Sequence, residues 1–243
     1  STSHQMRQVT VLKSLYGFLH RRGYLLTNPA GSLEYPHVEQ RLPRSVLSRE
    51  EARRLVMAPG AVGPLDLRDR AILETLYATG IRRQELAALK IDDIDLENGR
   101  LMVRQGKGKR DRLLPLSERA CAWIEKYLEE SRFHISRGAD DGSLFISHSG
   151  KRMHPEQMTK IVRRSIEAAE IEKPGACHLF RHTLATLMLE GGADLRYVQA
   201  MLGHADISTT QIYTRVAIGK LKEALDKSHP GAKLGRRAKV AVE

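Results

Sequence analysis

The sequence predicts a mostly helical protein with one small three-stranded antiparallel β-sheet, an α+β fold. Over most of the chain, apolar residues recur at the spacing that places them on one face of a helix. Between about residues 91 and 147, short strand-like runs separated by turn residues interrupt that spacing. No internal repeat is visible. Helices packed around a small sheet are therefore expected.

Apolar positions at helical spacing within residues 6–26 predict the first helix, which should end near Gly23, a residue placed to act as a C-cap. Its apolar positions share one face, and they are Val9, Leu12, Leu15, Tyr16 and Leu19. Residues 31–47, with two prolines and scattered charges, indicate a linker. Because a lone amphipathic helix needs a partner to bury its apolar face, this helix is interpreted as part of a larger helical domain.

Three helices are expected after the linker. Ser48 and Glu51 have the spacing of a capping box, which predicts a helix through Met57. A second helix covers residues 66–78, with Ala71, Ile72, Leu76 and Tyr77 toward the core. The run at 79–81 contains a glycine that breaks it, and a third helix covers 82–89.

The β-sheet is expected from three short runs. Residues 100–104 and 112–116 flank a basic turn at 106–110, which predicts a hairpin. Pro115 places the second of these strands at the edge of the sheet, because proline has no N–H to donate. Residues 144–147 are the third expected strand.

The remaining expected elements are helices, at residues 118–131, 155–169, 179–190, 195–202 and a short one that carries Tyr213. Asp194 and Ser208 are placed as N-caps of the last two, and Gly203 is placed to end the helix at 195–202. The tail is amphipathic near 217–227 and becomes basic and irregular beyond it. An apolar face on such a tail suggests docking on a partner subunit.

The composition favours a nucleic-acid partner. The net charge is +11 and the isoelectric point about 9.8, which suits a polyanion. Aromatic residues make up 5%, too few for a broad base-stacking platform. Two cysteines, no apolar run of the roughly 18 residues that span a membrane, and no leader pattern lead us to expect a cytoplasmic protein.

A set of polar residues suits phosphate chemistry, and its members are Arg82, Glu85, Lys107, His178, Arg181, His204 and Tyr213. Arginine offers a planar fork of donors to phosphate oxygens. Histidine can move a proton near neutral pH, and tyrosine can be a nucleophile when its phenolate is stabilised. Singly, each residue is more often a surface or core residue, and Lys109 and Arg110 compete with Lys107.

In their motifs and order, these residues resemble the tyrosine recombinases, the phage integrase family, and its Xer-like bacterial branch in particular. The matching stretches are 77–86, 106–116, His-Leu-Phe-Arg-His at 178–182, 192–196, Leu-Gly-His at 202–204 and Ser-Thr-Thr-Gln-Ile-Tyr at 208–213. The resemblance covers roughly residues 42–228. One departure is Phe180, where the family more often has leucine, and a packing role is expected there.

The resemblance implies a tyrosine-recombinase catalytic fold and a tyrosine site-specific recombinase that needs no metal, cofactor or ATP. Arg82 and Arg181 would hold the two non-bridging phosphate oxygens. Tyr213 would attack phosphorus and form a 3′-phosphotyrosine intermediate. Lys107 would protonate the leaving 5′-oxygen, and His178 would accept the tyrosine proton.

The resemblance also implies three supporting roles. His204 would donate a hydrogen bond to a phosphate oxygen. Glu85 would orient either Arg82 or His178. His182 is expected to be a buried hydrogen-bonding residue that supports the site.

For the whole chain, the resemblance implies four parts. Residues 1–40 would be the C-terminal part of a truncated helical domain that clamps DNA, followed by a linker at 41–47, a catalytic domain at 48–228 and a basic tail at 229–243. The expected partners are double-stranded DNA and a homo-tetramer, or a hetero-tetramer with a paralogue, assembled on two sites by tail exchange. No membrane partner is expected, and the expected place is the bacterial nucleoid. Chromosome dimer resolution, transposition and phage integration remain open.

Three other functions remain open. A zinc hydrolase could use Cys177, His178, His182 and His204, although it lacks the glutamate of a His-Glu-x-x-His helix. A DNA-binding protein of the same fold could bind without cleaving. A topoisomerase with the same chemistry would act as a monomer.

Overall fold

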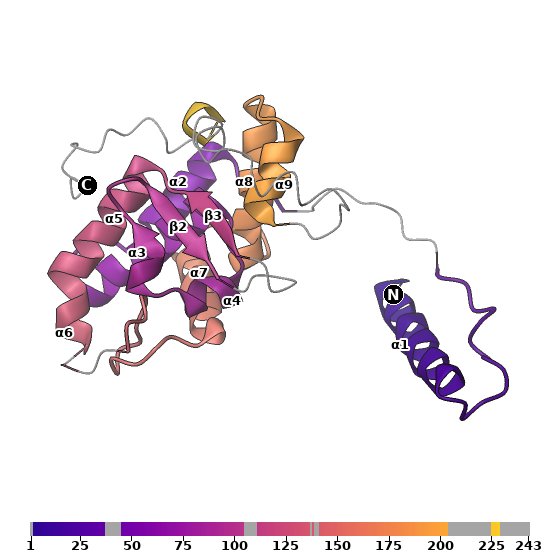
Figure 1. Cartoon of the computed structure of the whole chain (residues 1–243). Coiled ribbons are helices and arrows are strands. Elements are labelled where there is room, and N and C mark those ends of the chain that lie inside the picture. The colour runs from indigo at the N-terminus through magenta and orange to yellow at the C-terminus, as the bar shows by residue number, and fades with distance from the viewer. Residues whose placement is uncertain are drawn as a thin grey trace. The chain divides into compact units, whose positions relative to one another are not determined.

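The structure is a computed structural model that describes residues 2–36, 45–104, 111–136, 138, 141–203 and 225–228. It divides the chain into two compact units, Ser1–Arg44 and Ser45–Glu243 (Figure 1). The expected basic turn at 106–110, the helix that carries Tyr213, and most of the tail lie outside the described residues.

The N-terminal unit contains one long helix, α1 (Thr2–Arg21). It ends as expected at Gly23, whose φ of +77° is accessible to glycine at little cost. The Tyr24 N–H bonds the Leu19 carbonyl at 3.0 Å, which satisfies one of the last carbonyls of the helix. Leu12 and Leu15, on the expected apolar face, are 40% and 49% exposed. The helix is confirmed, and within its own unit these two leucines are exposed.

The C-terminal unit is built around α3 (Pro64–Thr79), in which every residue from Leu67 to Thr79 is buried. Helices α2 (Arg49–Met57), α5 (Glu118–Tyr127) and α8 (Cys177–Glu190) pack against it. The buried charges of α3 are paired, for example Arg70 with Glu74 at 3.0 Å. A helix buried on all sides is the expected centre of a mainly helical domain.

Local signals set the ends of these helices. The Ser48 Oγ accepts from the Glu51 N–H at 3.1 Å, and the Glu51 carboxylate accepts from the Ser48 N–H at 2.6 Å. The predicted capping box at the start of α2 is therefore confirmed. Gly80 ends α3 in the left-handed region with φ +58°, and the short helix α4 (Arg83–Ala88) follows with Arg82 at its N-cap.

The three-stranded antiparallel sheet is confirmed, with the order β1–β2–β3. Its strands are β1 (Ile94–Asp95), β2 (Arg100–Val103) and β3 (Arg112–Pro115). In the register of β2 and β3, Leu101 lies opposite Leu114, and both are fully buried. Strand β3 lies at an edge, as Pro115 predicts.

The prediction of a third strand at residues 144–147 is wrong. The third strand is β1, which a tight turn joins to β2: the Asn98 N–H bonds Asp95 at 2.9 Å, and Gly99 has φ +60°. Residues 144–147 instead meet several neighbours. The Leu144 N–H bonds the Leu89 carbonyl, the Leu144 carbonyl accepts from Tyr127, and Ile146 forms an isolated bridge with Arg152. Their backbone groups are satisfied outside the sheet, so strand pairing is not needed.

The other helices are close to expectation. The helix expected at 118–131 continues beyond α5 as a π-helical turn, η2 (Leu128–Arg132), and then α6 (Phe133–Ser136). A 3₁₀ turn, η1 (Ile91–Asp93), precedes β1. Helix α7 (Pro155–Ala168) begins at its proline, and α9 (Leu195–Leu202) is capped by Asp194 and ended by Gly203, as predicted. None of the described helices is long and apolar enough to cross a membrane.

Candidate active site

Arg82 lies between the end of α3 and the start of α4, and its side chain is 23% exposed. Its guanidinium donates to the Glu85 carboxylate at 2.9 Å and to the Gly203 carbonyl at 2.9 Å. Its own backbone N–H donates to the second oxygen of Glu85 at 3.0 Å. The N-cap of α4 therefore sets the direction of this arginine.

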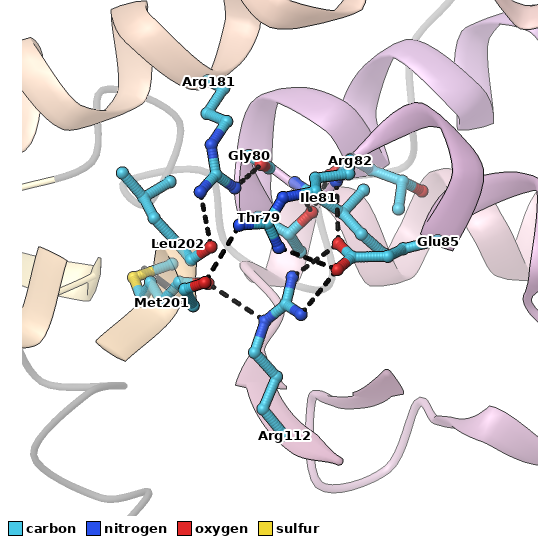
Figure 2. Close-up of polar contacts among 11 residues, drawn as sticks. Thr79, Gly80, Ile81, Arg82, Glu85, Arg112, Arg181, Met201 and Leu202 are labelled. Atoms are coloured by element: carbon cyan, nitrogen blue, oxygen red, sulfur yellow. Dashed lines mark hydrogen bonds and ion pairs between the residues drawn. The ribbon is translucent and has the colours of Figure 1, made fainter. Parts of the chain in front are cut away.

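Arg181 is a buried residue of α8, 7% exposed. Its guanidinium donates to the Gly80 carbonyl at 3.0 Å and to the Leu202 carbonyl. These carbonyls lie at the C-terminal ends of α3 and α9, where the helix dipole favours a cation. Two helix ends therefore hold this guanidinium beside Arg82 (Figure 2).

Glu85 lies between two arginines. It pairs with Arg82 on one side, and Arg112 of β3 donates to its two oxygens at 2.9 and 2.7 Å on the other (Figure 2). The sequence alone leaves open whether Glu85 orients Arg82 or His178, and among the described residues Glu85 contacts Arg82. Arg112 was not predicted as a site residue, and its only signal in the sequence is its place within the 106–116 stretch.

The charges of this cluster shift its pKa values. Burial tends to raise the pKa of Glu85, but hydrogen bonds and charge from Arg112 and then Arg82 outweigh it and lower that pKa to about 2. Burial, followed by repulsion from Arg82 and Arg112, lowers the pKa of Arg181 to about 10. Glu85 and Arg181 are therefore both charged at neutral pH. Three guanidiniums against one carboxylate leave an excess of positive charge that suits a phosphate group.

His178 and His182 lie one turn apart on α8, and both are exposed. Partial desolvation, followed by repulsion from Arg181, His182, Arg83 and Arg82, lowers the pKa of His178. His178 is therefore mostly neutral at neutral pH and can accept a proton. The prediction that His182 is buried is wrong, because α8 turns Leu179, Phe180 and Leu184 into the core and the histidines away from it.

Phe180 has the expected packing role. It is fully buried, and its ring lies 6.4 Å from the Tyr77 ring of α3, centroid to centroid. This contact joins α8 to the central helix one residue before Arg181.

Three of the expected site residues, Lys107, His204 and Tyr213, lie outside the described residues. Of their immediate chain neighbours, only Gly203, which precedes His204, is described, and its carbonyl accepts a hydrogen bond from Arg82. The structure therefore brings together Arg82, Glu85 and Arg181, with His178 on the same helix as Arg181.

Within the described ranges, no group of three or more histidine, cysteine, aspartate or glutamate residues could hold a metal ion. Cys177 is buried, and burial raises the pKa of its thiol. The zinc-hydrolase alternative therefore has no support from this part of the chain.

The chain therefore contains a mainly helical domain with a small sheet, and its buried Arg181 and partly exposed Arg82 form an arrangement of donors that suits a phosphate group. Residues 45–219 match the phage integrase family, and the chain belongs to that family. It is 44% identical to a tyrosine recombinase XerC 2 from Ralstonia nicotianae, over 96% of this chain and 66% of the relative. It is 39% identical to a tyrosine recombinase XerD from Lacticaseibacillus casei, over 92% of this chain and 76% of the relative. The chain thus spans about two thirds of the length of the first relative and three quarters of the second.

Solved structures show the same similarity. A XerA recombinase is 33% identical with a TM-score of 0.62, over 87% of this chain and 72% of its own. A XerH site-specific recombinase bound to its difH substrate, in a pre-cleavage complex, is 26% identical with a TM-score of 0.67, over 88% of this chain and 62% of its own. These matches agree with the helical fold and small sheet described above.

Proposed function

We propose that this chain is the catalytic part of a site-specific DNA recombinase that cuts and rejoins strands through a 3′-phosphotyrosine intermediate. The observation that carries the proposal is that Arg82 and Arg181 lie side by side near Glu85 and leave an excess of positive charge there. The family membership and the recombinase relatives support it. The site-specific recombinase XerH, bound to its difH substrate, supports DNA as the partner.

In the proposed reaction, Arg82 and Arg181 bind the non-bridging oxygens of the scissile phosphate and stabilise the charge of the five-coordinate transition state. The Tyr213 hydroxyl oxygen forms a bond to phosphorus while the bond from phosphorus to the 5′-oxygen breaks. The tyrosine proton passes to His178, and Lys107 gives a proton to the leaving 5′-oxygen. His204 donates a hydrogen bond to the phosphate.

Rejoining reverses this sequence. The 5′-hydroxyl of a second strand attacks the phosphotyrosine, a new phosphodiester forms, and Tyr213 leaves. One phosphoester bond replaces another in each step, so ATP is not needed. The neutral form of His178, favoured by its lowered pKa, suits its role as the first proton acceptor.

The remaining parts of the proposal concern the assembly. Residues 1–40 would belong to a domain that clamps DNA, residues 41–47 would link it to the catalytic domain at 48–228, and 229–243 would form a basic tail. The enzyme would act as a tetramer on two DNA sites, homo- or hetero-oligomeric, with tails exchanged between subunits. Its place would be the bacterial cytoplasm, on the nucleoid.

Residues 225–228, which directly precede the basic tail, are described and bear on this exchange. Leu225 is fully buried against the hydrophobic core, and the Ser228 hydroxyl lies 3.5 Å from the Gly191 carbonyl at the end of α8. In a single chain, residues 225–228 therefore pack on their own catalytic unit. Docking on a neighbour would require this turn to leave that position.

Trapping of a covalent adduct tests the function. Fragmented genomic DNA, which supplies many candidate sites, is incubated with the protein, denatured and sequenced from the trapped Tyr213 adducts. A duplex nicked near the mapped site then serves as a suicide substrate. We expect a protein–DNA adduct from the natural chain, none from Tyr213→Phe, and a much slower adduct from Lys107→Ala than from Lys109→Ala. Chelators should have no effect.

The other functions give different results. DNA binding without any adduct would identify a non-cleaving protein and overturn the proposal. Loss of cleavage with chelators would point to a metal hydrolase. Relaxation of supercoiled DNA by a monomer, without strand exchange between two sites, would identify a topoisomerase.

A further inference from the structure

Arg112, the first residue of β3, forms a bidentate ion pair with Glu85, 27 positions earlier in the chain. The two N–H···O distances are 2.9 and 2.7 Å, and the side chains are only 14% and 8% exposed. Two parallel donors facing two carboxylate oxygens fix both the distance and the orientation of the pair. This pair is therefore a geometric constraint as well as an attraction of charges.

From the described residues, the Glu85 carboxylate accepts hydrogen bonds from four N–H groups. One oxygen accepts from the side chains of Arg82 and Arg112, and the other accepts from the Arg82 backbone and the Arg112 side chain. A carboxylate has about four acceptor positions, so this one is saturated. Its orientation is set by both arginines together, and a change at Arg112 must alter how Glu85 holds Arg82.

Arg112 also contacts the end of α9. Its Nε donates to the Met201 carbonyl at 3.4 Å, and a Cβ added to Gly203 would lie 3.1 Å from its Cδ and Nε. Gly203 in turn gives its carbonyl to Arg82. One side chain thus contacts both supports of Arg82, namely Glu85 and the last residues of α9.

We propose that Arg112 is a positioning residue for strand cleavage: through Glu85 and the end of α9, it holds the Arg82 guanidinium in the direction needed to bind the scissile phosphate. This inference rests on the proposed recombinase function. A lysine at this position keeps the charge but cannot offer two parallel donors.

The test is the rate of adduct formation on a suicide duplex at saturating protein, so that DNA affinity does not limit it. We expect Arg112→Gln to cleave roughly 10- to 100-fold more slowly, the range typical of lost supporting contacts. The cleavage rate of Arg112→Lys should lie between those of Arg112→Gln and the natural chain. Arg104→Gln is the matched control: Arg104 follows β2, is largely exposed and pairs with Asp93, so its rate should match that of the natural chain.

A double-mutant cycle with Arg82→Lys shows whether Arg112 acts through Arg82. In the Arg82→Lys background, Arg112→Gln should slow cleavage by less than a third of its effect in the natural background, because the group that it positions is already changed. Equal effects in both backgrounds would overturn the proposal, since they would mean that Arg112 acts independently.

The pH profile distinguishes positioning from a general loss of structure. Without Arg112, burial of Glu85 is opposed by Arg82 alone, so its pKa should rise and the acid limb of the cleavage rate should move to higher pH. A purely structural defect would lower the rate equally at every pH, and that result would contradict the proposal.

Two further outcomes overturn the inference. One is a folded Arg112→Gln variant with the natural cleavage rate. The other is a failure of both Arg112 variants to fold, which would make Arg112 a residue of the fold rather than of positioning. Absence of an adduct from the natural chain and from Arg104→Gln would instead contradict the recombinase function itself.

Discussion

At the scale of single residues, Arg181 has both a structural and a chemical role. Its buried guanidinium satisfies the carbonyls of Gly80 and Leu202, which are 101 and 21 positions away in the chain. The same group is proposed to bind phosphate. Loss of its side chain should therefore lower both stability and activity.

We expect Arg181→Ala to lower the free energy of unfolding by about 1–3 kcal/mol, because two buried carbonyls lose their donor. Strand cleavage should fall by roughly 100- to 1000-fold, as for loss of one charge-stabilising donor. Urea unfolding and the suicide-substrate assay measure the two effects. Arg196→Ala, at an exposed position of α9, is the stability control and should change unfolding by less than about 0.5 kcal/mol. A stable, fully active Arg181→Ala variant would contradict both roles.

Glu85 makes stability depend on pH. Its pKa is about 2 in the folded chain and 4.5 in the reference state. A carboxylate with a depressed folded pKa stabilises the fold above its unfolded pKa, and this contribution is lost as the pH falls toward the folded value. Its contribution should therefore be complete near neutral pH and should decline in acid.

Between pH about 5 and about 3, the difference in unfolding free energy between the natural chain and Glu85→Gln should narrow by about 2 kcal/mol. Urea titrations of both proteins at each pH measure it. Glu50→Gln is the control: Glu50 is exposed and pairs with Arg53, so its difference should change much less. A difference that is constant with pH would show that Glu85 is not held as a carboxylate by its arginines.

At the scale of elements, two helix ends support the site. Helices α3 and α9 both end at a left-handed glycine, Gly80 with φ +58° and Gly203 with φ +60°. The carbonyls near these ends accept hydrogen bonds from Arg82, Arg112 and Arg181. The way these helices end is therefore part of how the arginines are placed.

Gly80→Ala should destabilise the protein by about 1–3 kcal/mol more than Gly192→Ala. Both glycines have positive φ, so both variants share the backbone strain. A Cβ at Gly80 would also lie 3.0 Å from the side chains of Leu184 and Leu202, whereas one at Gly192 meets nothing within 4 Å. Thermal or urea unfolding of the pair measures the difference. Equal destabilisation would mean that the two leucines move aside without cost.

Among the elements, local signals predicted most helix boundaries correctly. The capping box of α2 and the glycine that ends α3 depend on neighbours within a few residues. The third strand was wrongly placed at residues 144–147, because this run is apolar enough for a strand. Only tertiary contacts decide where its N–H and carbonyl groups bond. His182 was wrongly predicted to be buried, because its spacing from His178 does not show which face of α8 packs against the core.

At the scale of the whole molecule, residues 225–228, just before the basic tail, pack against the catalytic unit of their own chain. Leu225 belongs to the hydrophobic core, so this C-terminal segment contributes to the fold. If subunits exchange tails on DNA, assembly and the placement of Tyr213 are coupled, because this residue lies just before the tail in the chain. Cleavage would then depend on a neighbouring subunit.

Deletion of residues 217–243 should reduce both recombination and DNA binding, but the loss of recombination should be larger by roughly tenfold or more. Gel-shift affinity and strand exchange between two sites measure the two quantities, and thermal melting confirms that the shortened chain is folded. A chain that ends at Ser228 is the control: it keeps Leu225 and should retain recombination. Equal losses of binding and recombination in the longer deletion would refute coupling through the tail.

The identity and order of the chemical groups are properties of the sequence alone. So are the helix caps, because they depend on residues only a few positions apart, and the basic charge that favours DNA. Three things depend on the tertiary structure: the meeting of Arg82 with Arg181, the choice of Arg82 over His178 as the partner of Glu85, and the presence of Arg112. Each joins segments distant in the chain, and packing of α3, α8, α9 and β3 determines which of their polar groups come within hydrogen-bonding distance.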